Sequence, residues 1–522
     1  MKNIGKMYEA EDAARSVWLQ RSRAIAALTM PAILPWGQYH KYNQQDPALP
    51  QSYQSDGSRI ITNLTGKILT SVFPIGRPWM KYSIDPRARS EMTEQQINKI
   101  ENLLYLREIM LRSAIESSGP ISRRRGHGGF QSIKRTTLSR LLITGDALEY
   151  VDDDLSIRSY RNDMYVTKRD SSGNLLWIIT KESIDPLSLP EEQQAKLEIK
   201  DEDDPSKRME DIYTLIEWNQ QTKKWLVKQE IDEVIFNEFE KNVNPWISST
   251  YELLAPDHYG RGFVELQIWP DLKIVDILSE YMLDFAALAS TNIRVIDQSS
   301  NIQPEDLVKR NGSIIKAGRV SGGQLQDVGW LKSDRIPDFS VVQQTLARTQ
   351  DKLGKAGLLD SQSVRRSERT TAFEVQNVTL QELNGALGGV YAALAYQQQI
   401  PLIEVAEEVL SKSKGFPKIP KGITINTVTG LSALNREADA RRSLNMLQII
   451  SNMDPQLRSR INEEVLLRIL VHDSGIDRPD LILTEQQFKA KAEAAAQAQA
   501  QAQASQKAID VTGNIAQSQA TQ

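Results

Sequence analysis

The chain has 522 residues, which is enough for roughly three to four domains of about 150 residues each. Hydrophobic residues make up 40% and charged residues 25%, the balance of a globular protein with ample apolar material for a core. The 63 Lys and Arg residues against 67 Asp and Glu residues give a net charge of −4, which argues against a polybasic nucleic-acid coat or membrane binder. Any contact with DNA must therefore come from the local placement of charge.

Cysteine is absent, which excludes disulfides, thiolate metal sites and cysteine nucleophiles. The four histidines, His40, His127, His258 and His472, lie far apart and lack the spacing of metal ligands. The charged N-terminus is not a signal peptide, and no stretch has the roughly eighteen uninterrupted apolar residues of a membrane span. We therefore expect no cofactor, no metal and no membrane association.

The first 261 residues combine helices with a β-rich module. Apolar spacing predicts, in order, a helix from Tyr8 to about Ala27, a helix around 64–72, a strand at 79–84, and helices at 93–117 and 129–144. Alternating segments after Gly145 predict strands in ALEYV, IRSY, MYVTKRD and LLWIITKESI, with a hairpin turn at Ser171–Asn174, and a second hairpin in IYTLIEWN and KWLVKQEI. The acidic run at 200–211 is interpreted as a solvated loop.

From Gly262 the pattern changes to one long helix with apolar flanks on both sides of a narrow polar seam. The seam consists of Lys273, Asp276, Glu280 and Asp284, spaced three and four residues apart. A helix packed between neighbouring copies in a ring would have this pattern, and an ordinary buried helix would have it too.

Residues 291–335 are predicted to form a compact insert of strand-like pieces with one short helix. A second, more polar helix follows from Pro337 to about Leu359, and one of its sides carries Arg348, Lys352 and Lys355. Together these segments make a helical hairpin with an inserted cap. The acidic stripe of Asp276, Glu280 and Asp284 is expected either to pair with this basic stripe or to face a channel.

Residues 361–367 are predicted to be a loop, and 371–413 a helix with heptad spacing. Gly385, Gly388 and Gly389 interrupt that helix; they indicate a kink or very close packing, or else an earlier helix end. A Pro/Gly connector with one strand follows, then helices over 432–475. The Ala/Gln-rich tail from 491 has almost no large apolar side chain, so it is either a lone helix or disordered.

The sequence carries no enzymatic motif. No G-x-x-x-x-G-K-[ST] loop is present, and the glycine-rich Gly318–Gly323 lacks the Lys-Ser/Thr that a phosphate-binding loop needs. The basic segment Ser122–Gly129 (SRRRGHGG) suggests an anion site, although a single basic loop in a long chain is more often solvated or paired. We therefore expect a protein that is not an enzyme.

Several segments together resemble the portal (head-to-tail connector) proteins of podovirus-type bacteriophages. They are LTGKILTSVFPIGRPWMKYSI (64–84), LLITGDALEYV (141–151), YGRGFVELQIWPDLKIVD (259–276), SERTTAFEVQNVTLQELNGALGGVYAALAYQQQIPLI (367–403), TGLSALNREADARR (429–442) and ILTEQQ (482–487). They occur in the same order as in the family and span most of the chain. The 367–403 block is the most specific.

The resemblance implies a mainly helical α+β portal fold with a wing, a stem, a clip and a crown. On this chain it implies a wing at 1–261, stem helices at 262–290 and 336–359, a clip at 291–335, a channel loop at 360–370, further wing at 371–431, a helical crown at 432–490 and a tail at 491–522. It also implies a homo-oligomer, expected to be a dodecamer, at one capsid vertex of the virion, assembled in the host cytoplasm. Its expected partners are double-stranded DNA bound without sequence preference, a terminase ATPase, major capsid or scaffold protein, and tail adaptor proteins.

In the family, the loop before the long wing helix projects into the channel. Here that loop corresponds to about Leu359–Thr370 and contains Arg365, Arg366 and Arg369. Repeated around a ring, these guanidiniums would lie within a Debye length, about 8 Å, of DNA phosphates and would read no base. The alternative is that they pair with Glu368, Glu374 or acids of a neighbouring subunit.

Two function classes stay open at this point. The first is a portal that conducts DNA, and the second is another ring-forming virion or tail-adaptor protein that does not grip DNA. A nucleotide-driven translocase is disfavoured because the phosphate-binding loop is missing.

Overall fold

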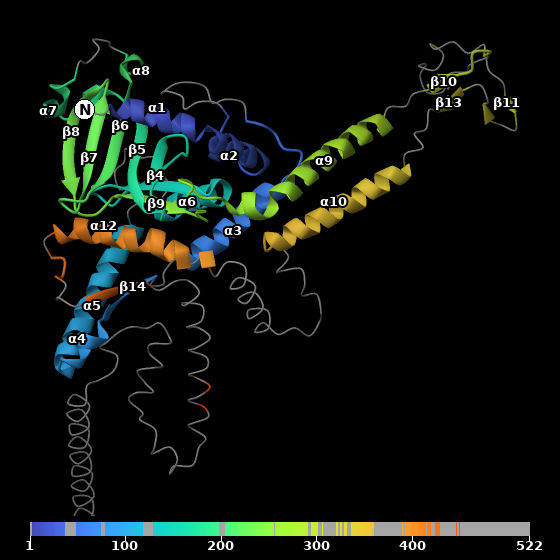
Figure 1. Ribbon diagram of the computed structural model, residues 1–522. Coiled ribbons are helices and arrows are strands. Elements are labelled where there is room, and N and C mark those ends of the chain that lie inside the picture. The colour runs from blue at the N-terminus through green and yellow to red at the C-terminus, as the bar shows by residue number, and fades with distance from the viewer. Residues whose placement is uncertain are drawn as a thin grey trace, which may run out of the picture. The chain divides into compact units, whose positions relative to one another are not determined.

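The computed structural model describes most of the chain up to residue 427 (Figure 1). The described residues are 3–36, 49–74, 79–117, 129–197, 204–254, 256–290, 294–300, 305, 320–321, 324–325, 328–330, 336–359, 389–390, 392–413, 415–418, 423–427, 445 and 448. They belong to two units, Met1–Ile75 with Ala114–Val409 and Gly76–Ser113 with Leu410–Gln522. The helices expected over 432–475 and the Ala/Gln tail lie almost wholly outside the described residues.

The first unit begins with two helices where the sequence predicts one. α1 (Ile4–Ala14) and α2 (Ser16–Leu28) are separated at Arg15, whose backbone (φ −86°, ψ 4°) leaves the helical conformation. The buried Arg15 side chain donates from Nη1 to the Asn162 carbonyl at 2.7 Å and from Nε to Asp12 at 2.8 Å. The prediction of a continuous helix from Tyr8 to Ala27 was wrong because this tertiary contact is invisible in the local pattern.

Two antiparallel sheets form the β-rich module. One has the order β4-β5-β6-β7-β8 and the other β3-β2-β9. Their strands are β2 (Asp146–Val151), β3 (Ile157–Tyr160), β4 (Tyr165–Arg169), β5 (Leu175–Ile184), β6 (Glu210–Asn219), β7 (Lys224–Ile231), β8 (Val234–Lys241) and β9 (Trp246–Thr250). Both predicted hairpins are confirmed: Gly173, at φ +86°, makes the β4–β5 turn, and Trp218 pairs with Trp225 across β6–β7.

The core lies on both faces of the five-stranded sheet. On one face Ile178, Ile216 and Val227 pack with Leu148 and Trp246 of the smaller sheet. On the other face, α1 covers the strands by packing Ile4 and Tyr8 against them. Successive side chains of the strands point to opposite faces of the sheet, so they contribute to two separate hydrophobic layers.

Several short helical segments are also present in the described residues. They are η1 (Pro31–Ile33), η2 (Pro186–Ser188) and α7 (Glu191–Gln194), with α8 (Pro205–Arg208) in the acidic stretch expected to be a loop. α3 (Asp56–Val72) packs on α6 (Phe130–Thr144), and Thr65 and Ser139 meet at 3.3 Å between them.

The predicted helical hairpin is present. The π-helical segment η3 (Val264–Ile268) leads into α9 (Trp269–Ser290), and α10 (Ile336–Ala356) lies beside α9 (Figure 1). Of the insert between them, the structure describes strands β10 (Arg294–Ile296), β11 (Val320–Ser321), β12 (Gln324–Leu325) and β13 (Val328–Trp330), paired β10–β13 and β11–β12. A second π-helical segment, η6 (Ala395–Gln399), lies within a helix that already includes residues 392–394 and continues as α12 (Ile400–Ser411).

In the second unit, β1 (Met80–Ile84) pairs antiparallel with β14 (Ile423–Thr427). α4 (Pro86–Ser90) and α5 (Glu94–Glu116) follow β1 along the chain. Both strands were predicted from the sequence, but their pairing across more than 300 residues was not. Arg107 of α5 lies over the Phe416 ring, with its guanidinium carbon 4.2 Å from the ring centroid.

A glycine-lined crossing joins the β-module to the hairpin. Gly145 ends α6 at φ +85°, and a Cβ there would lie 2.4–2.5 Å from backbone atoms of residues 260–262. We expect Gly145→Ala to lower the free energy of unfolding by roughly 2–5 kcal/mol, because both the conformation and the space exclude a side chain. In a matched control, Gly66→Ala should raise it by up to about 1 kcal/mol, since this mid-helix position of α3 has open space. Urea unfolding of both variants checks this. An unchanged urea midpoint for Gly145→Ala would contradict the close backbone approach at Gly145.

Candidate channel and assembly surfaces

The α9–α10 hairpin is antiparallel, and its register is set by one aromatic contact. Phe285 and Phe339 stack with ring centroids 4.7 Å apart and an interplanar angle of 22°. Because both helices rise equally per residue, Asp276 lies level with Arg348, while Asp284 lies level with Ser340. The acidic and basic stripes therefore overlap only at the level of Asp276 and Arg348, and extend from there in opposite directions along the hairpin.

Ion pairs fix the root of the hairpin. Arg261 donates to Asp257 at 2.9 Å and to Glu265 at 2.7 Å, and Arg21 of α2 lies 3.1 Å from the same Glu265. Glu265 belongs to η3, the first turn of the hairpin. The direction of α9 is therefore tied to α2 as well as to the glycine crossing.

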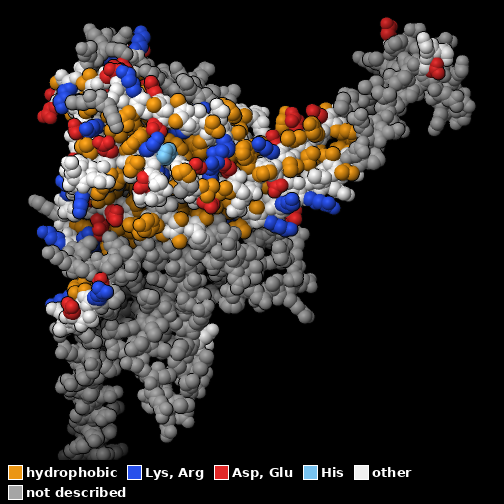
Figure 2. All heavy atoms as spheres, viewed as in Figure 1, with side chains coloured by type: hydrophobic (Ala, Val, Ile, Leu, Met, Phe, Trp, Pro, Cys, Tyr) orange, Lys and Arg blue, Asp and Glu red, His pale blue; other side chains and the backbone are white. Residues whose placement is uncertain are grey.

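One face of α9 is apolar and exposed. Ile274, Ile277 and Tyr281, at spacing i, i+3, i+7, are 42%, 47% and 60% exposed, while Leu272 and Val275 on the opposite side are fully buried. We call these three residues the α9 strip. Figure 2 shows hydrophobic side chains along the hairpin, with acids along the α9 edge and Lys and Arg along the α10 edge. A contiguous apolar face of this kind is typical of a surface that another protein covers.

The acidic stripe is partly occupied within the subunit. Asp276 accepts hydrogen bonds from the Ser52 hydroxyl at 2.5 Å and from the Tyr53 amide at 2.8 Å. The Tyr53 hydroxyl bonds to Glu280, which raises the pKa of this exposed tyrosine. Asp284, further along the helix, is exposed. The segment before α3 thus covers Asp276 and reaches Glu280, while Asp284 at the outer end of the stripe stays exposed.

The basic stripe of α10 is exposed along its length. Lys355 pairs with Asp351 at 2.7 Å, one turn away on its own helix, and Arg348 and Lys352 are exposed. In the described part of the hairpin, the acidic and basic stripes form no ion pair within one subunit. Pairing between subunits and a channel-facing acidic stripe both stay predictions.

Almost all of the other predicted site residues lie outside the described residues. Arg365, Arg366 and Arg369 lie outside the described residues, as do Gly385, Gly388 and the basic segment 122–128. Gly389 is described as helical, with no atom within 4 Å of the position of a Cβ. The channel arginines and the helix kink therefore stay predictions.

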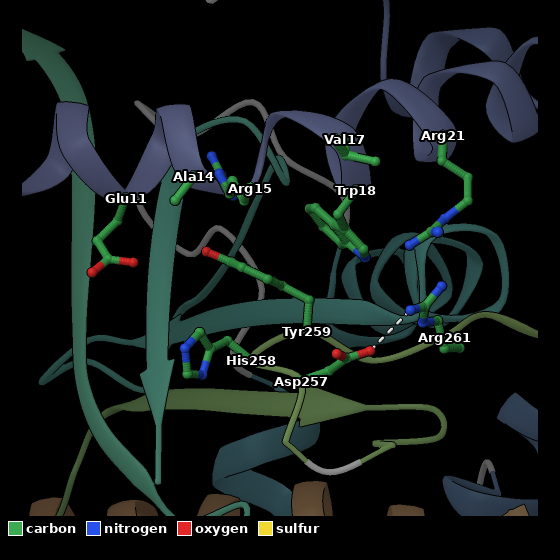
Figure 3. Close-up of a pocket in the computed structure, with 10 residues that line it drawn as sticks. All are labelled: Glu11, Ala14, Arg15, Val17, Trp18, Arg21, Asp257, His258, Tyr259 and Arg261. Atoms are coloured by element: carbon green, nitrogen blue, oxygen red, sulfur yellow. Dashed lines mark hydrogen bonds and ion pairs between the residues drawn. The ribbon is translucent and has the colours of Figure 1, made fainter. Parts of the chain in front are cut away.

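A cavity of about 290 Å³ lies where α1 and α2 meet residues 257–261 (Figure 3). Trp18 stacks on Tyr259 with ring centroids 4.5 Å apart, and the charged lining residues have partners: Arg15 with Asp12, Glu11 with Lys168, and Arg261 with Asp257. Burial lowers the pKa of His258. Since its charges are already paired, we interpret the cavity as part of the joint at the root of the hairpin, not as a reaction centre.

A buried polar cluster that sequence reasoning missed lies behind this cavity. Fully buried Asp146 accepts from the Tyr165 hydroxyl at 2.7 Å, and its backbone carbonyl accepts from Asn162 at 2.7 Å. Burial raises the pKa of Asp146 to about 6, although the Arg169 and Arg15 guanidiniums oppose the rise. Only the three-dimensional burial marks this carboxylate among the many acids of the chain.

The raised pKa of Asp146 predicts a pH dependence of stability. The folded state binds this proton more tightly than the unfolded state, so the contribution is fully present below about pH 4 and is lost as pH rises through about 6. Its size is on the order of 3 kcal/mol. We expect Asp146→Asn to flatten the dependence of the urea midpoint on pH between 4 and 7, whereas exposed Asp153→Asn should leave it unchanged. A slope that persists in Asp146→Asn would assign the effect to other groups.

Two features are absent from the described residues. No group of three or more His, Asp or Glu side chains there is placed to hold a metal ion. Within the same part of the chain, no helix combines the length and the apolar character needed to cross a membrane.

Comparisons with known proteins match nearly the whole chain. A sequence model of the family described as "Bacteriophage head to tail connecting protein" matches residues 1–482. The portal protein of Enterobacteria phage T3 is 25% identical over 488 residues, covering 91% of this chain and 87% of that protein. The portal protein of Escherichia phage T7 is 26% identical over 506 residues (92% and 90%), and that of Pseudomonas phage phiKMV is 25% identical over 484 residues (90% and 90%).

Among solved structures, a chain from the neck of a native gene transfer agent particle covers 78% of this chain and 98% of its own length. It is 10% identical with a TM-score of 0.34, a level at which the likeness supports no further conclusion. The sequence matches confirm the resemblance to podovirus-type portal proteins. The chain therefore belongs to the family of bacteriophage head to tail connecting proteins, and its role is that of a head-to-tail connector in the virion.

Proposed function

We propose that twelve copies of this chain form a ring at one capsid vertex and that double-stranded DNA passes through the ring during packaging and ejection. A terminase ATPase would supply the energy, and capsid or scaffold protein and tail adaptors would bind the outside and the ends. In this proposal residues 1–261 and 371–431 form the wing, 262–290 and 336–359 the stem, 291–335 the clip and 432–490 the crown.

The exposed α9 strip is the observation that carries the proposal. Ile274, Ile277 and Tyr281 are exposed in the single chain, so a monomer would leave their apolar surface in water and gain no free energy from its burial. A ring buries such a face without a second kind of protein, because each copy packs this face against a different surface of the next copy. The strip is thus explained by the ring.

The charges at the two edges of the hairpin support the same contact. Asp284 is exposed on α9, and Arg348 and Lys352 are exposed on α10, so opposite edges of one subunit carry opposite charge (Figure 2). In a head-to-tail ring, the acidic edge of one copy meets the basic edge of the next. Exposed pairs contribute only about 0–1 kcal/mol each, so these charges would set the register more than the affinity.

DNA contact is assigned to the arginines of the channel loop. Arg365, Arg366 and Arg369 follow α10 along the chain. Guanidiniums bind phosphate oxygens without reading bases, which suits a conduit for a whole genome. Their sequence-independent attraction would also weaken as salt rises.

The proposal predicts a protein with no chemistry of its own. Purified oligomer should show no ATP hydrolysis above a buffer blank, with or without linear duplex DNA. Size-exclusion fractions should be assayed one by one, because a contaminating ATPase would not follow the oligomer peak. ATP hydrolysis that follows the oligomer peak would contradict the proposal and favour a nucleotide-driven translocase.

A further inference from the structure

The last turn of α10 is held from outside by two side chains of α3. Asn63 donates from Nδ2 to the Gly357 carbonyl at 2.8 Å and to the Leu358 carbonyl at 3.2 Å. Lys67 donates from Nζ to the same Leu358 carbonyl at 2.6 Å. Carbonyls at a helix C-terminus have no partner within the helix, and a lysine there is also favoured by the helix dipole. The end of α10 is therefore capped by another helix.

Packing and backbone conformation tighten this attachment. Ile60, Asn63 and Lys67 lie at spacing i, i+3, i+7 and so share one face of α3. A Cβ on Gly357 would lie 2.6 Å from the Ile60 side chain, so the two helices approach as closely as a glycine permits. Leu358 sits at φ +52°, which a leucine keeps only where its surroundings hold it.

The other attachment joins α3 to the η6 segment of the helix that continues as α12. Gln399 is fully buried and donates from Nε2 to the carbonyl of Val72, which is the last residue of α3. Its neighbour Gln397 accepts from the Thr250 amide of β9 at 2.7 Å. The π-helical turn widens the spacing of residues 395–399, so that glutamines two positions apart reach different elements.

α3 is itself firmly embedded. Its buried residues Ile61, Leu64, Thr65 and Ile68 pack towards the interior, and Thr65 meets Ser139 of α6. Lys67 and Val72 are 72 − 67 = 5 residues apart, about 8 Å along the axis of one helix. The chain before residue 360 and the chain after residue 388 are thus both fastened to the same short stretch of α3.

We propose that α3 couples these two parts of the chain, so that they move as one unit: Asn63 and Lys67 position the end of α10, and Gln399 positions the η6 segment of the helix that continues as α12. This inference rests on the proposed function, in which the intervening residues 360–370 carry the arginines that contact DNA. Asn63, Lys67 and Gln399 are positioning residues that touch no DNA. They determine where the chain leaves α10 and where the η6 segment lies.

Hydrogen exchange tests the attachment on the assembled protein. Lys67→Met keeps most of the side-chain volume and removes the donor, so the amides of Gly357, Leu358 and Leu359 should exchange roughly tenfold faster. Lys67→Arg should restore slow exchange, and Thr70→Ala, which removes a hydroxyl bonded only within α3, should leave it unchanged. Unchanged hydrogen exchange in Lys67→Met would show that Lys67 does not attach the end of α10 to α3.

Genome retention tests the coupling. Capsids with Lys67→Met or Gln399→Met should form normally but keep a smaller fraction of full-length genomes, and Lys67→Arg should behave as the original protein. The double variant should be no worse than the more affected single, because breaking either attachment releases the same unit. Additive losses would mean two independent supports and overturn the coupling. If Gln399→Met fails to fold, Asn63→Ala combined with Lys67→Met still tests the α10 end, where normal retention counts against the proposal.

Failure of this inference can be told apart from failure of the proposed function. If Arg365, Arg366 and Arg369 can be replaced without loss of retention, the DNA-contacting loop itself is wrong. If the arginine variant loses DNA while Lys67→Met and Gln399→Met both retain it, only the coupling is wrong.

Discussion

Replacing Arg365, Arg366 and Arg369 together with alanine is expected to leave ring assembly intact and to abolish retention of packaged DNA. Apart from Leu359 and Val364, the segment 359–370 has no large apolar side chain, so truncating its arginines should cost the ring little buried area. Each subunit would lose three phosphate contacts, and a ring multiplies that loss by its number of copies. Because counterion release scales with the number of phosphate contacts, the effect should exceed that of any single substitution.

The measurement is the length of genome retained in capsids assembled with the triple variant. A charge-matched control replaces Lys223, Lys224 and Lys228 of the β6–β7 hairpin with alanine and should retain full-length DNA. Normal retention by the arginine variant would show that these residues are no clamp. Failure to assemble would show instead that they pair within or between subunits, the alternative in which Glu368 or Glu374 neutralises them.

Replacing Ile277 and Tyr281 with aspartate is expected to prevent ring formation. The two side chains are about half exposed in one subunit, so the substitutions should cost the monomer less than about 0.5 kcal/mol each. In the ring, each aspartate would be buried without a partner, at a cost of several kcal/mol per copy. Light scattering of the purified variant should give the mass of a monomer with an unchanged circular dichroism spectrum.

Leu187→Asp is the matched control for the α9 strip. Leu187 is 49% exposed on η2, so the substitution removes a similar apolar surface outside the α9–α10 hairpin, and this variant should still assemble. Rings formed by the Ile277 and Tyr281 double variant would show that the strip faces solvent or another partner. Loss of assembly in both variants would point to general aggregation or misfolding.

Elements with strong local periodicity could be predicted from the sequence. The helices at 94–116, 130–144 and 269–290 and the β4–β5 and β6–β7 hairpins need only apolar spacing and turn chemistry, both of which are local. β8 and β9 were missed because their alternation is mixed with charged and small residues such as those of Val234–Lys241. Edge strands commonly carry such charges, which weakens the periodic signal.

The contacts that build the site could not be predicted in the same way. Asp276 was assigned to a charge stripe from helical spacing, yet its partners are Ser52 and Tyr53, more than 200 residues earlier. The break at Arg15 likewise depends on the Asn162 carbonyl. Helical spacing indicates which face a residue occupies, but the partner on that face is set by tertiary packing that no local pattern encodes.

End-on images of the purified protein by electron microscopy test the central claim most directly. Class averages should show closed rings, with twelve-fold symmetry and a central hole wide enough for a DNA duplex. The Ile277 and Tyr281 double variant, imaged in the same way, should show no rings. A monomer that persists at high concentration, or rings whose centre is too narrow for a duplex, would contradict a DNA-conducting portal.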